Sequence, residues 1–363
     1  MITSLRCSVH SYKHLLGTHC VTAALRNLVH YYTGEVMSEA MIFGLGSGLN
    51  FTYIRRPGSN FFLTMGRGTE IETLFADLVN IDLDCVLFRE RGPAWQFVQE
   101  LISEQHPVMV DTDMFHLPHM IQSHNLMPDI HFGGHKILVT GYDMTLGRAS
   151  VYDYAWRDEQ TLDCEVLADA RSTPKCPSPP ANAAYLFRCP RRVEVTRQTI
   201  LLSLSRTLAH MRNPASNHVG LPALDRFTRQ VLNWARLGGA EQLETNLRLA
   251  SFMFQRAGTG GGNYRALFTR FLDESSRYVQ SDSLDRAARV YRQLAILWRD
   301  LSVLLSQWAD AHVTGRDSDP GLLSATLRDI WSAEVLGLEL IEDVVHSSAT
   351  TQAQPTMKEF LCQ

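Results

Sequence analysis

The stretch SYKHLLGTHCVTAALRNLVHYY, residues 11–32, places a cysteine at the start of a segment whose apolar residues recur at helical spacing. This periodicity predicts a helix that begins near His19 and Cys20. A helix N-terminus supplies partial positive charge and free N–H groups, which stabilise a thiolate. The stretch therefore favours a reactive cysteine, although a single cysteine near a helix start is more commonly a small buried apolar residue.

The composition is that of a globular protein, with 363 residues, 45% hydrophobic, 20% charged and a net charge of −4. The length favours two domains, and the charge balance shows no basic stripe of the kind that binds nucleic acid. No apolar run resembles a signal peptide or reaches the roughly 18 residues of a membrane helix. The seven cysteines are irregularly spaced and form no CxxC. We expect reduced thiols in a cytoplasmic protein, with neither a disulfide framework nor a metal site.

The order of elements predicts an α+β domain followed by an all-α domain. Residues 1–192 combine helical and strand-like segments, and residues 193–350 carry helical periodicity throughout, with Gly, Pro, Asn, Asp or Ser between segments. The tail, 351–363, is expected to be flexible. In the first domain we predict helices after Cys20 and at 69–80 and 93–105, and strands at 83–88, 107–113, 135–143, 148–155 and 183–189. A cysteine helix followed by strands that carry histidine is the layout of papain-like cysteine enzymes.

His135 and Asp153 are the candidate partners of Cys20. His135 opens a strand-like run after two glycines, which permit a close backbone approach. A turn centred near residue 145 places position 135 opposite about 155, so Asp153 lies diagonal to His135 on the same face. The three residues supply a nucleophile, a base and a group that orients the base. His131 is a rival base, but the sequence HFGGH favours a loop there.

Two further histidines precede the cysteine. His14 lies six residues before Cys20, where papain-like enzymes place an oxyanion-hole glutamine. A neutral imidazole N–H can donate to a developing oxyanion, beside the N–H of the cysteine itself. His14 is therefore a candidate secondary donor, with a local structural role as the alternative. His19 is grouped with it, and its simpler interpretation is a helix-entry residue.

Several long motifs resemble the butirosin biosynthesis protein H family. The resemblance is carried by GTHCVTAALRNLVHYYTGEVMSEAMIFGLGSGLNFTY (17–53), PVMVDTDMFHLPH (107–119) and HFGGHKILVTGYD (131–143), and by QRAGTGGGNYRALFTRFLDES (255–275) for the helical domain that usually follows. It implies a papain-type acyltransferase that moves an acyl group from the phosphopantetheine thioester of an acyl or peptidyl carrier protein to an amine. The product would be an amide of natural-product or antibiotic biosynthesis. Applied to this sequence, the resemblance implies that Cys20 attacks the thioester, that His135 transfers the proton and that Asp153 orients His135. It implies no bound cofactor.

The glycine-rich segment FGLGSGLNF, residues 43–51, lacks the lysine of a P-loop and the spacing of a dinucleotide-binding fingerprint. We interpret it as a tight turn. Gly46 and Gly48 are candidate substrate-binding residues in this turn, where we expect them to line the pocket that receives the acyl group.

A second glycine-rich segment, GTGGGNYR, joins two predicted helices at residues 258–265. Its N–H groups, with Gly260, Gly261 and Arg265, either bind a carboxylate or phosphate or dock the helical domain. The sequence favours neither role over the other.

The segment VDTDMFHLPHM, residues 110–120, contains two acids and two histidines but no HExxH. We do not expect a metal ion there. Asp113 is instead a candidate contact for a substrate amine.

Two rivals to the acyltransferase remain. One is a thioesterase, amidase or peptidase with the same three residues, and the other is a carrier-binding scaffold without activity. The expected partners are a carrier protein and a small-molecule amine, with a homodimer left open. A carrier protein is acidic, so its docking surface needs basic residues. The candidates, which a solvated helix face explains equally well, are Arg188, Arg191, Arg192, Arg197 and Arg206.

Overall fold

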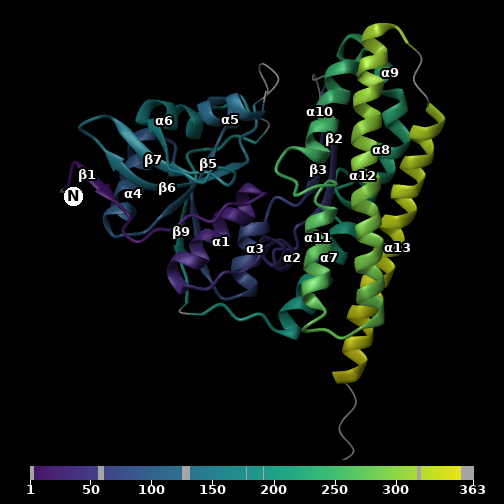
Figure 1. Cartoon of the computed structure of the whole chain (residues 1–363), viewed down its shortest axis with the longest axis horizontal. Coiled ribbons are helices and arrows are strands. Elements are labelled where there is room, and N and C mark those ends of the chain that lie inside the picture. Colours follow the sequence, from purple (N-terminus) through teal and green to yellow (C-terminus); the bar gives the residue numbers. More distant parts are fainter. Residues whose placement is uncertain are drawn as a thin grey trace, which may run out of the picture. The chain divides into compact units, whose positions relative to one another are not determined.

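The computed structural model describes residues 4–55, 61–124, 131–176, 178–190, 192–316 and 320–352. The chain divides into two compact units (Figure 1). The first comprises Met1–Ile42 and Ala76–Glu194, and the second Phe43–Phe75 and Val195–Gln363. The sequence predicts one unbroken first domain, 1–192, whereas the structure groups Phe43–Phe75 with the helical unit. The predicted tail lies outside the described residues from 353 onward.

The first unit contains an antiparallel sheet in the order β4-β9-β5-β6-β7-β8. Its central strand, β6 (His135–Asp143), pairs along one edge with β5 (Val108–Thr112) and then β1 (Arg6–Ser8), and along the other with β7 (Arg148–Tyr152). The remaining strands are β4 (Asp82–Val86), β8 (Gln160–Asp163) and β9 (Ala184–Arg188). Nearly all of β6 is buried, which is why its sequence reads as an apolar run without strict alternation.

Helix α1 (Cys20–Thr33) packs against β6. Its apolar face is fully buried, and it ends at Gly34, whose positive φ of 76° lets its N–H donate to the carbonyl of His30. The other helical elements are α2 (Glu39–Leu45), α3 (Ile71–Leu78), α4 (Arg91–Ser103), the short η1 (Met114–His116), α5 (Pro118–His124) and α6 (Cys164–Ser172). The predicted helices and strands of residues 1–192 are thus present, and the structure adds several short elements that local patterns did not indicate.

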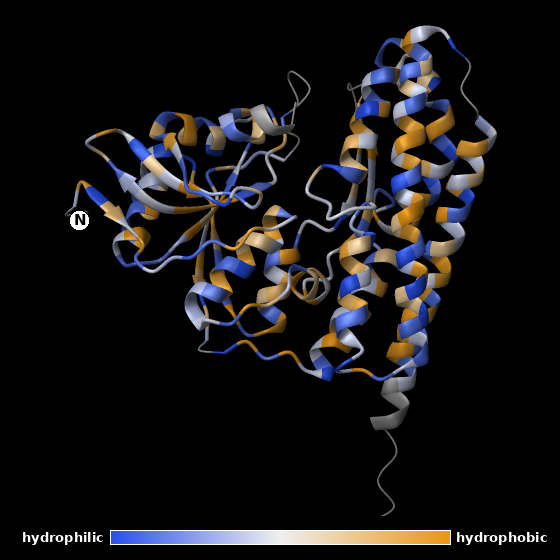
Figure 2. Cartoon of the chain, in the orientation of Figure 1, coloured by the Kyte–Doolittle hydropathy of each residue, from blue (hydrophilic) through white to orange (hydrophobic). Residues whose placement is uncertain are grey.

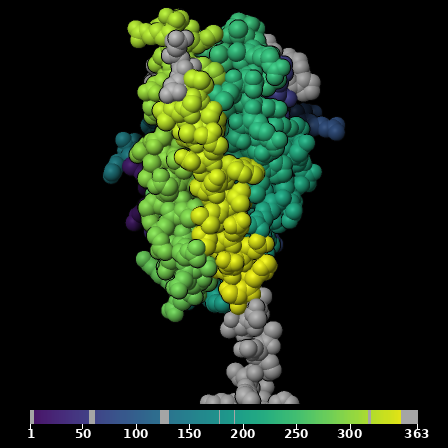
Figure 3. All heavy atoms as spheres, turned by 90° about the vertical axis from the view of Figure 1, so that its right-hand side faces the viewer, coloured from purple at the N-terminus to yellow at the C-terminus, as the bar shows by residue number. Residues whose placement is uncertain are grey.

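The second unit combines helices with a β-hairpin. The hairpin strands are β2 (Leu49–Arg55) and β3 (Phe62–Arg67). The helical elements are α7 (Arg197–Arg212), α8 (Gly220–Gln230), η2 (Val231–Asn233), α9 (Trp234–Gly238), η3 (Ala240–Gln242), α10 (Leu243–Gln255), α11 (Arg265–Ser275), α12 (Asp282–Thr314) and α13 (Pro320–Gln352). Figure 3 shows α13 between α12 and the α7–α8 pair, all of which it contacts.

Aromatic packing explains why the hairpin belongs to the helical unit. The Phe62 ring stacks on Trp234 at 4.8 Å between centroids, and Phe51 lies 5.3 Å from Trp298 of α12. The Trp234 indole N–H also donates to the Tyr53 hydroxyl at 2.9 Å. Figure 2 shows hydrophobic and hydrophilic residues alternating along the long helices, as expected for helices that bury one face. No helix of the described residues is long and apolar enough to cross a membrane.

Candidate active site

Cys20 occupies the first position of α1, as the sequence predicts. The preceding residue, His19, has extended backbone angles of φ −137° and ψ 128°. Gly17 permits the tight approach to the helix, since a Cβ there would lie 2.4 Å from the Cβ of Ala23. The Gly17 N–H donates to the carbonyl of Tyr154 at 2.6 Å, which ties the loop to the end of β7. The Cys20 thiol is therefore held at the helix end where the N–H groups point outward.

A buried acid, Glu39, fixes the residues in front of the cysteine. Its carboxylate accepts the N–H groups of Thr18 at 2.9 Å and His19 at 3.1 Å, and the Thr22 hydroxyl at 2.9 Å. Such charge-assisted bonds are about twice as strong as neutral ones. The approach of the Glu39 side chain to α1 is a tertiary contact between segments about 20 residues apart, which no local pattern indicates.

His135 and Asp153 lie together, as their predicted strand alignment requires. The His135 Nε2–H donates to Asp153 Oδ2 at 2.8 Å, and both side chains are at most 2% exposed. The pairing of β6 with β7 ends at Leu138 opposite Tyr152, the register that the predicted turn requires, and Asp153 directly follows the last paired residue of β7. The His135 ring also hydrogen bonds to the Cys20 thiol. Because Nε2 is taken by Asp153, Nδ1 is the nitrogen that remains for the sulfur.

The electrostatics of this group favour a charged imidazole. Burial lowers the pKa of His135, but the charge and hydrogen bond of Asp153, with a smaller effect of Cys20, outweigh it and raise the pKa to about 10. Burial raises the pKa of Asp153, yet His135 and a second histidine, His119, bring it below its ordinary range. An imidazolium beside a thiol at a helix N-terminus stabilises the thiolate.

His119 is the residue that sequence reasoning missed. Its Nε2–H donates to the same Asp153 Oδ2 at 2.9 Å, and its side chain is 7% exposed. Trp156 packs edge-on against the His119 ring, 4.9 Å between centroids. The carboxylate that orients His135 is thus held from a second direction. Nothing in the spacing of His119 signals this contact, which depends on the position of α5.

His14 lines a small hollow beside Cys20. Its ring stacks on Tyr152 at 4.9 Å, and its Nδ1 lies 3.2 Å from the Tyr12 hydroxyl. Burial lowers the pKa of His14, partly offset by the main-chain carbonyl of Asp153, so the ring is neutral at pH 7. Nε2 is buried and finds no well-formed hydrogen bond among the described residues. The hollow measures about 10 Å³, roughly the space of one water molecule.

The other residues predicted near the cysteine have different surroundings. His19 Nδ1 lies 3.2 Å from Thr22 Oγ1, which fits a helix-entry residue. Asp113 is fully buried and accepts hydrogen bonds from the N–H groups of Phe115 and Phe132 and from His131, the rival base. Asp113 is therefore not open to a substrate amine in this structure, and His131 is bonded to Asp113 rather than to Asp153.

The glycine-rich candidates all belong to the second unit, whereas Cys20 belongs to the first. Gly46 lies in the turn after α2, and the Gly48 N–H donates to the carbonyl of Phe43 at 2.8 Å, so this segment is the tight turn that the sequence predicts. Gly260 and Gly261 both have positive φ, 64° and 100°, in the loop that leads into α11.

Arg265 is a buried structural residue. Its Nε donates to Glu334 Oε1 at 2.5 Å, and its Nη1 donates to the carbonyls of Asn50, Gly66 and Asn263 at 2.8–3.1 Å. The side chain is fully inaccessible to solvent. Arg265 therefore joins α11, α13 and the hairpin, rather than offering a charge to a ligand.

Two of the five arginines proposed for carrier docking form ion pairs within the first unit. Arg188 Nη1 lies 2.5 Å from Asp82 and 3.2 Å from Asp84, and Arg192 lies 3.8 Å from Glu35. Arg191 lies outside the described residues, and Arg197 and Arg206 belong to α7 of the second unit.

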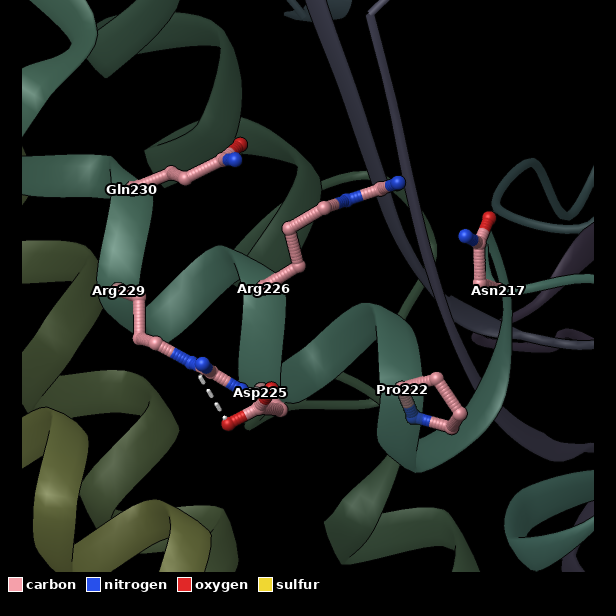
Figure 4. Close-up of a pocket in the computed structure, with 6 residues that line it drawn as sticks. All are labelled: Asn217, Pro222, Asp225, Arg226, Arg229 and Gln230. Carbon is pink, nitrogen blue, oxygen red and sulfur yellow. Dashed lines mark hydrogen bonds and ion pairs between the residues drawn. The ribbon is translucent and has the colours of Figure 1, made fainter.

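A hollow of about 300 Å³ opens along α8 in the second unit (Figure 4). Its two arginines are engaged, Arg229 with Asp225, and Arg226 with the Tyr53 carbonyl and His218 Nδ1. Its charges are thus satisfied within the protein.

The first unit places a thiol at a helix N-terminus, in contact with a buried histidine–carboxylate pair beside an antiparallel sheet. Residues 19–154 match the family model described as butirosin biosynthesis protein H, N-terminal, and residues 165–338 match a domain of unknown function, DUF4872. These two matches in this order are the architecture of the butirosin biosynthesis protein H family, to which the chain belongs. A search of curated proteins finds no match.

Proposed function

We propose that the protein is a cysteine-dependent acyltransferase of natural-product biosynthesis. It takes an acyl group from the phosphopantetheine thioester of an acyl or peptidyl carrier protein onto Cys20 and passes the group to an amine, forming an amide. The observation that carries the proposal is the contact of Cys20, at the start of α1, with the His135–Asp153 pair. The family name, which refers to the biosynthesis of the antibiotic butirosin, supports a biosynthetic role. The fold we assign to the first unit is papain-like.

In the first half-reaction, the Cys20 thiolate attacks the thioester carbonyl. An S–C bond forms to Cys20, the S–C bond to phosphopantetheine breaks, and the departing sulfur takes a proton from the His135 imidazolium. Exchange of one thioester for another is nearly neutral in energy, so the enzyme has only to stabilise the intermediate. During this exchange, the hydrogen bond of 2.8 Å between Asp153 and Nε2 keeps the His135 imidazole oriented.

In the second half-reaction, the acceptor amine attacks the acyl-Cys20 carbonyl. His135, now neutral, takes a proton from the nitrogen as the C–N bond forms, and Cys20 leaves as the thiolate. The imidazolium and thiolate are thereby restored for the next cycle. Water competes with the amine, so transfer requires that the site exclude water once Cys20 is acylated.

His14 supplies a side-chain donor for the oxyanion, beside the N–H of Cys20. The Tyr12 hydroxyl can donate to His14 Nδ1, because burial raises the pKa of Tyr12 and keeps its proton in place. That bond places the imidazole proton on Nε2, and His14 lines the same small hollow as Cys20. Loss of one oxyanion donor typically lowers kcat by about 10²–10³-fold.

The proposal is tested by incubating the protein with a panel of acyl-loaded carrier proteins, followed by intact-mass and peptide mass spectrometry. We expect an acyl mass on Cys20, absent from Cys20→Ala and retained in Cys164→Ser, a half-buried thiol of the same unit. Addition of amines should release the group as an amide.

An acyl adduct that water clears faster than any amine would identify a thioesterase instead. Carrier-linked substrates that leave no adduct, with turnover of small amides or peptides, would identify an amidase or peptidase. Acyl transfer that persists in Cys20→Ala would contradict the nucleophile itself.

A further inference from the structure

A second cluster of reactive side chains lies in the first unit, outside the candidate active site. One ligand atom each from Asp113, His131 and Cys176 lies within 4.8 Å of the other two. Asp113 and Cys176 are buried, and the His131 side chain is 12% exposed. The three residues come from separate segments: the end of β5, the residues before β6 and the loop after α6. No short motif unites them, so the sequence predicts no metal site here.

Close backbone packing brings the segments together. A Cβ on Gly133 would lie 2.2 Å from the Ser178 carbonyl and 3.0 Å from the Cys176 Cβ, so only glycine lets the entry to β6 pass this loop. The Asp113 N–H donates to the carbonyl of Ala170 in α6 at 2.8 Å. Asp113 Oδ1 accepts the N–H of Phe132 at 2.9 Å, which holds the neighbouring His131 in place.

A fourth donor lies next to the cluster. His116 Nε2 is 4.0 Å from Asp113 Oδ2, and this nitrogen is buried without a hydrogen-bond partner among the described residues. A buried ring nitrogen without a partner is costly unless something binds it. The His116 and His131 rings lie 6.1 Å apart between centroids, a spacing that lets both face one ion placed near Asp113.

We propose that Asp113, His131 and Cys176, with His116 as the fourth ligand, bind one Zn²⁺ ion as a structural site. One sulfur, two imidazole nitrogens and one carboxylate oxygen are the donor types of four-coordinate zinc. The charges also balance, since a carboxylate and a thiolate together neutralise a divalent cation in a buried place. Softer and harder divalent metals fit less well, because the set mixes a thiolate with nitrogen and oxygen donors.

Zinc binding exchanges protons for the ion. Without metal, the Cys176 thiol and the His131 Nδ1–H both donate hydrogen bonds to Asp113. On binding, Cys176 loses its proton to solvent and the His131 ring proton moves from Nδ1 to Nε2, so one proton is released for each zinc ion taken up. No oxidation or reduction is involved.

The ion would stabilise the positions of residues next to the candidate active site. Asp113 is one residue beyond Thr112, which pairs with His135. His116 is three residues before His119, whose ring holds Asp153. A zinc ion bound to Asp113, His116 and His131 would therefore tie the ends of β5 and β6 and the start of α5 to the loop after α6.

The test is the zinc content of the full-length protein, measured by inductively coupled plasma mass spectrometry after reloading with Zn²⁺ and removal of excess metal. We expect about one zinc per chain, as for a single four-coordinate site. Cys176→Ser and His131→Ala should weaken zinc binding by more than the roughly 10–100-fold that loss of an outer-shell partner costs. The controls Cys164→Ser and Cys20→Ala should keep their zinc, the latter because the ion is not at the active site.

A readout on the wild-type protein keeps the proposal testable if the variants fail to fold. X-ray absorption at the zinc edge should show one sulfur and three nitrogen or oxygen ligands. Wild-type protein that takes up no zinc would overturn the proposal. So would zinc retained at equal affinity by folded Cys176→Ser, zinc lost in Cys20→Ala, or an absorption spectrum without a sulfur ligand.

Discussion

The substitution Asp153→Asn removes the charge that holds His135 and leaves the shape of the side chain almost unchanged. Asp153 Oδ2 accepts bonds from His135 at 2.8 Å and His119 at 2.9 Å, both in the buried interior. The Tyr154 N–H, which donates to Oδ1 at 2.7 Å, can still be satisfied by the amide oxygen. The substitution therefore isolates the charge-dependent part of the arrangement.

Two estimates of the effect agree. Two hydrogen bonds to a charged group contribute about 1.5–3 kcal/mol each, and breaking a buried ion pair on one side costs about 3–5 kcal/mol. The rise in the pKa of His135 from its ordinary 6.5 to about 10, to which Asp153 contributes most and Cys20 less, is of the same order, roughly 5 kcal/mol. We expect Asp153→Asn to lower the free energy of unfolding by about 3–5 kcal/mol near pH 6.

The pH dependence has a definite sign. Since the folded pKa of His135 lies above its unfolded value, its stabilisation is complete below pH 6.5 and is lost as the pH rises toward about 10. The folded pKa of Asp153 lies below its unfolded value, so its stabilisation is complete above about pH 3.9 and is lost in acid. The difference between wild type and variant should therefore be greatest between about pH 4 and 6.5. It should be smaller by about pH 9.5, where the charge of His135 is largely lost but neutral imidazole N–H groups still donate to the carboxylate.

Urea unfolding of both proteins at about pH 5.5 and 9.5, followed by circular dichroism, measures this difference. Asp158→Asn, an exposed acid five residues along the chain, is the matched control and should stay within about 0.5 kcal/mol of wild type at both pH values. A difference between wild type and Asp153→Asn that is equal at the two pH values would refute the charged-pair reasoning.

Three further substitutions test buried contacts that stabilise the two units. Glu39→Gln should lower the free energy of unfolding by about 1–3 kcal/mol in urea, because buried N–H groups lose a charged acceptor, whereas the exposed Glu35→Gln should have little effect. Gly17→Ala should cost about 1–3 kcal/mol through overpacking, and an unchanged Tm would show that the loop has room. Arg265→Met should cost about 3–5 kcal/mol by leaving Glu334 buried without a partner, and adding Glu334→Leu should restore much of the loss. A double variant as unstable as Arg265→Met alone would mean that the ion pair is not the cause.

The features predicted from sequence were those set by local patterns. The helix that begins at Cys20 follows from apolar spacing, and the alignment of His135 with Asp153 follows from one turn between adjacent strands. Both depend on residues that are close along the chain. The catalytic roles of these residues stay predictions, but the contacts that those roles need are present.

What the sequence did not reveal depends on contacts between distant segments. The hairpin Leu49–Arg67 reads as part of the first domain, and only its aromatic packing on the helices places it with the second unit. The sequence leaves Arg265 open between binding an anion and docking the helical domain, and only the contact with Glu334, 69 residues away, identifies it as a buried structural residue. His119 reaches Asp153 through the placement of α5, which no periodicity encodes.

The proposed function depends most directly on the reactivity of Cys20, which alkylation with iodoacetamide measures without knowledge of the acyl group. The rate of Cys20 modification, followed by peptide mass spectrometry across pH, should already be high well below the value of about 8.5 typical of free cysteine. In His135→Ala the rate should fall and its rise should move toward that value. A wild-type rate that rises only above about pH 8.5, or that is unchanged in His135→Ala, would contradict a thiolate held by His135.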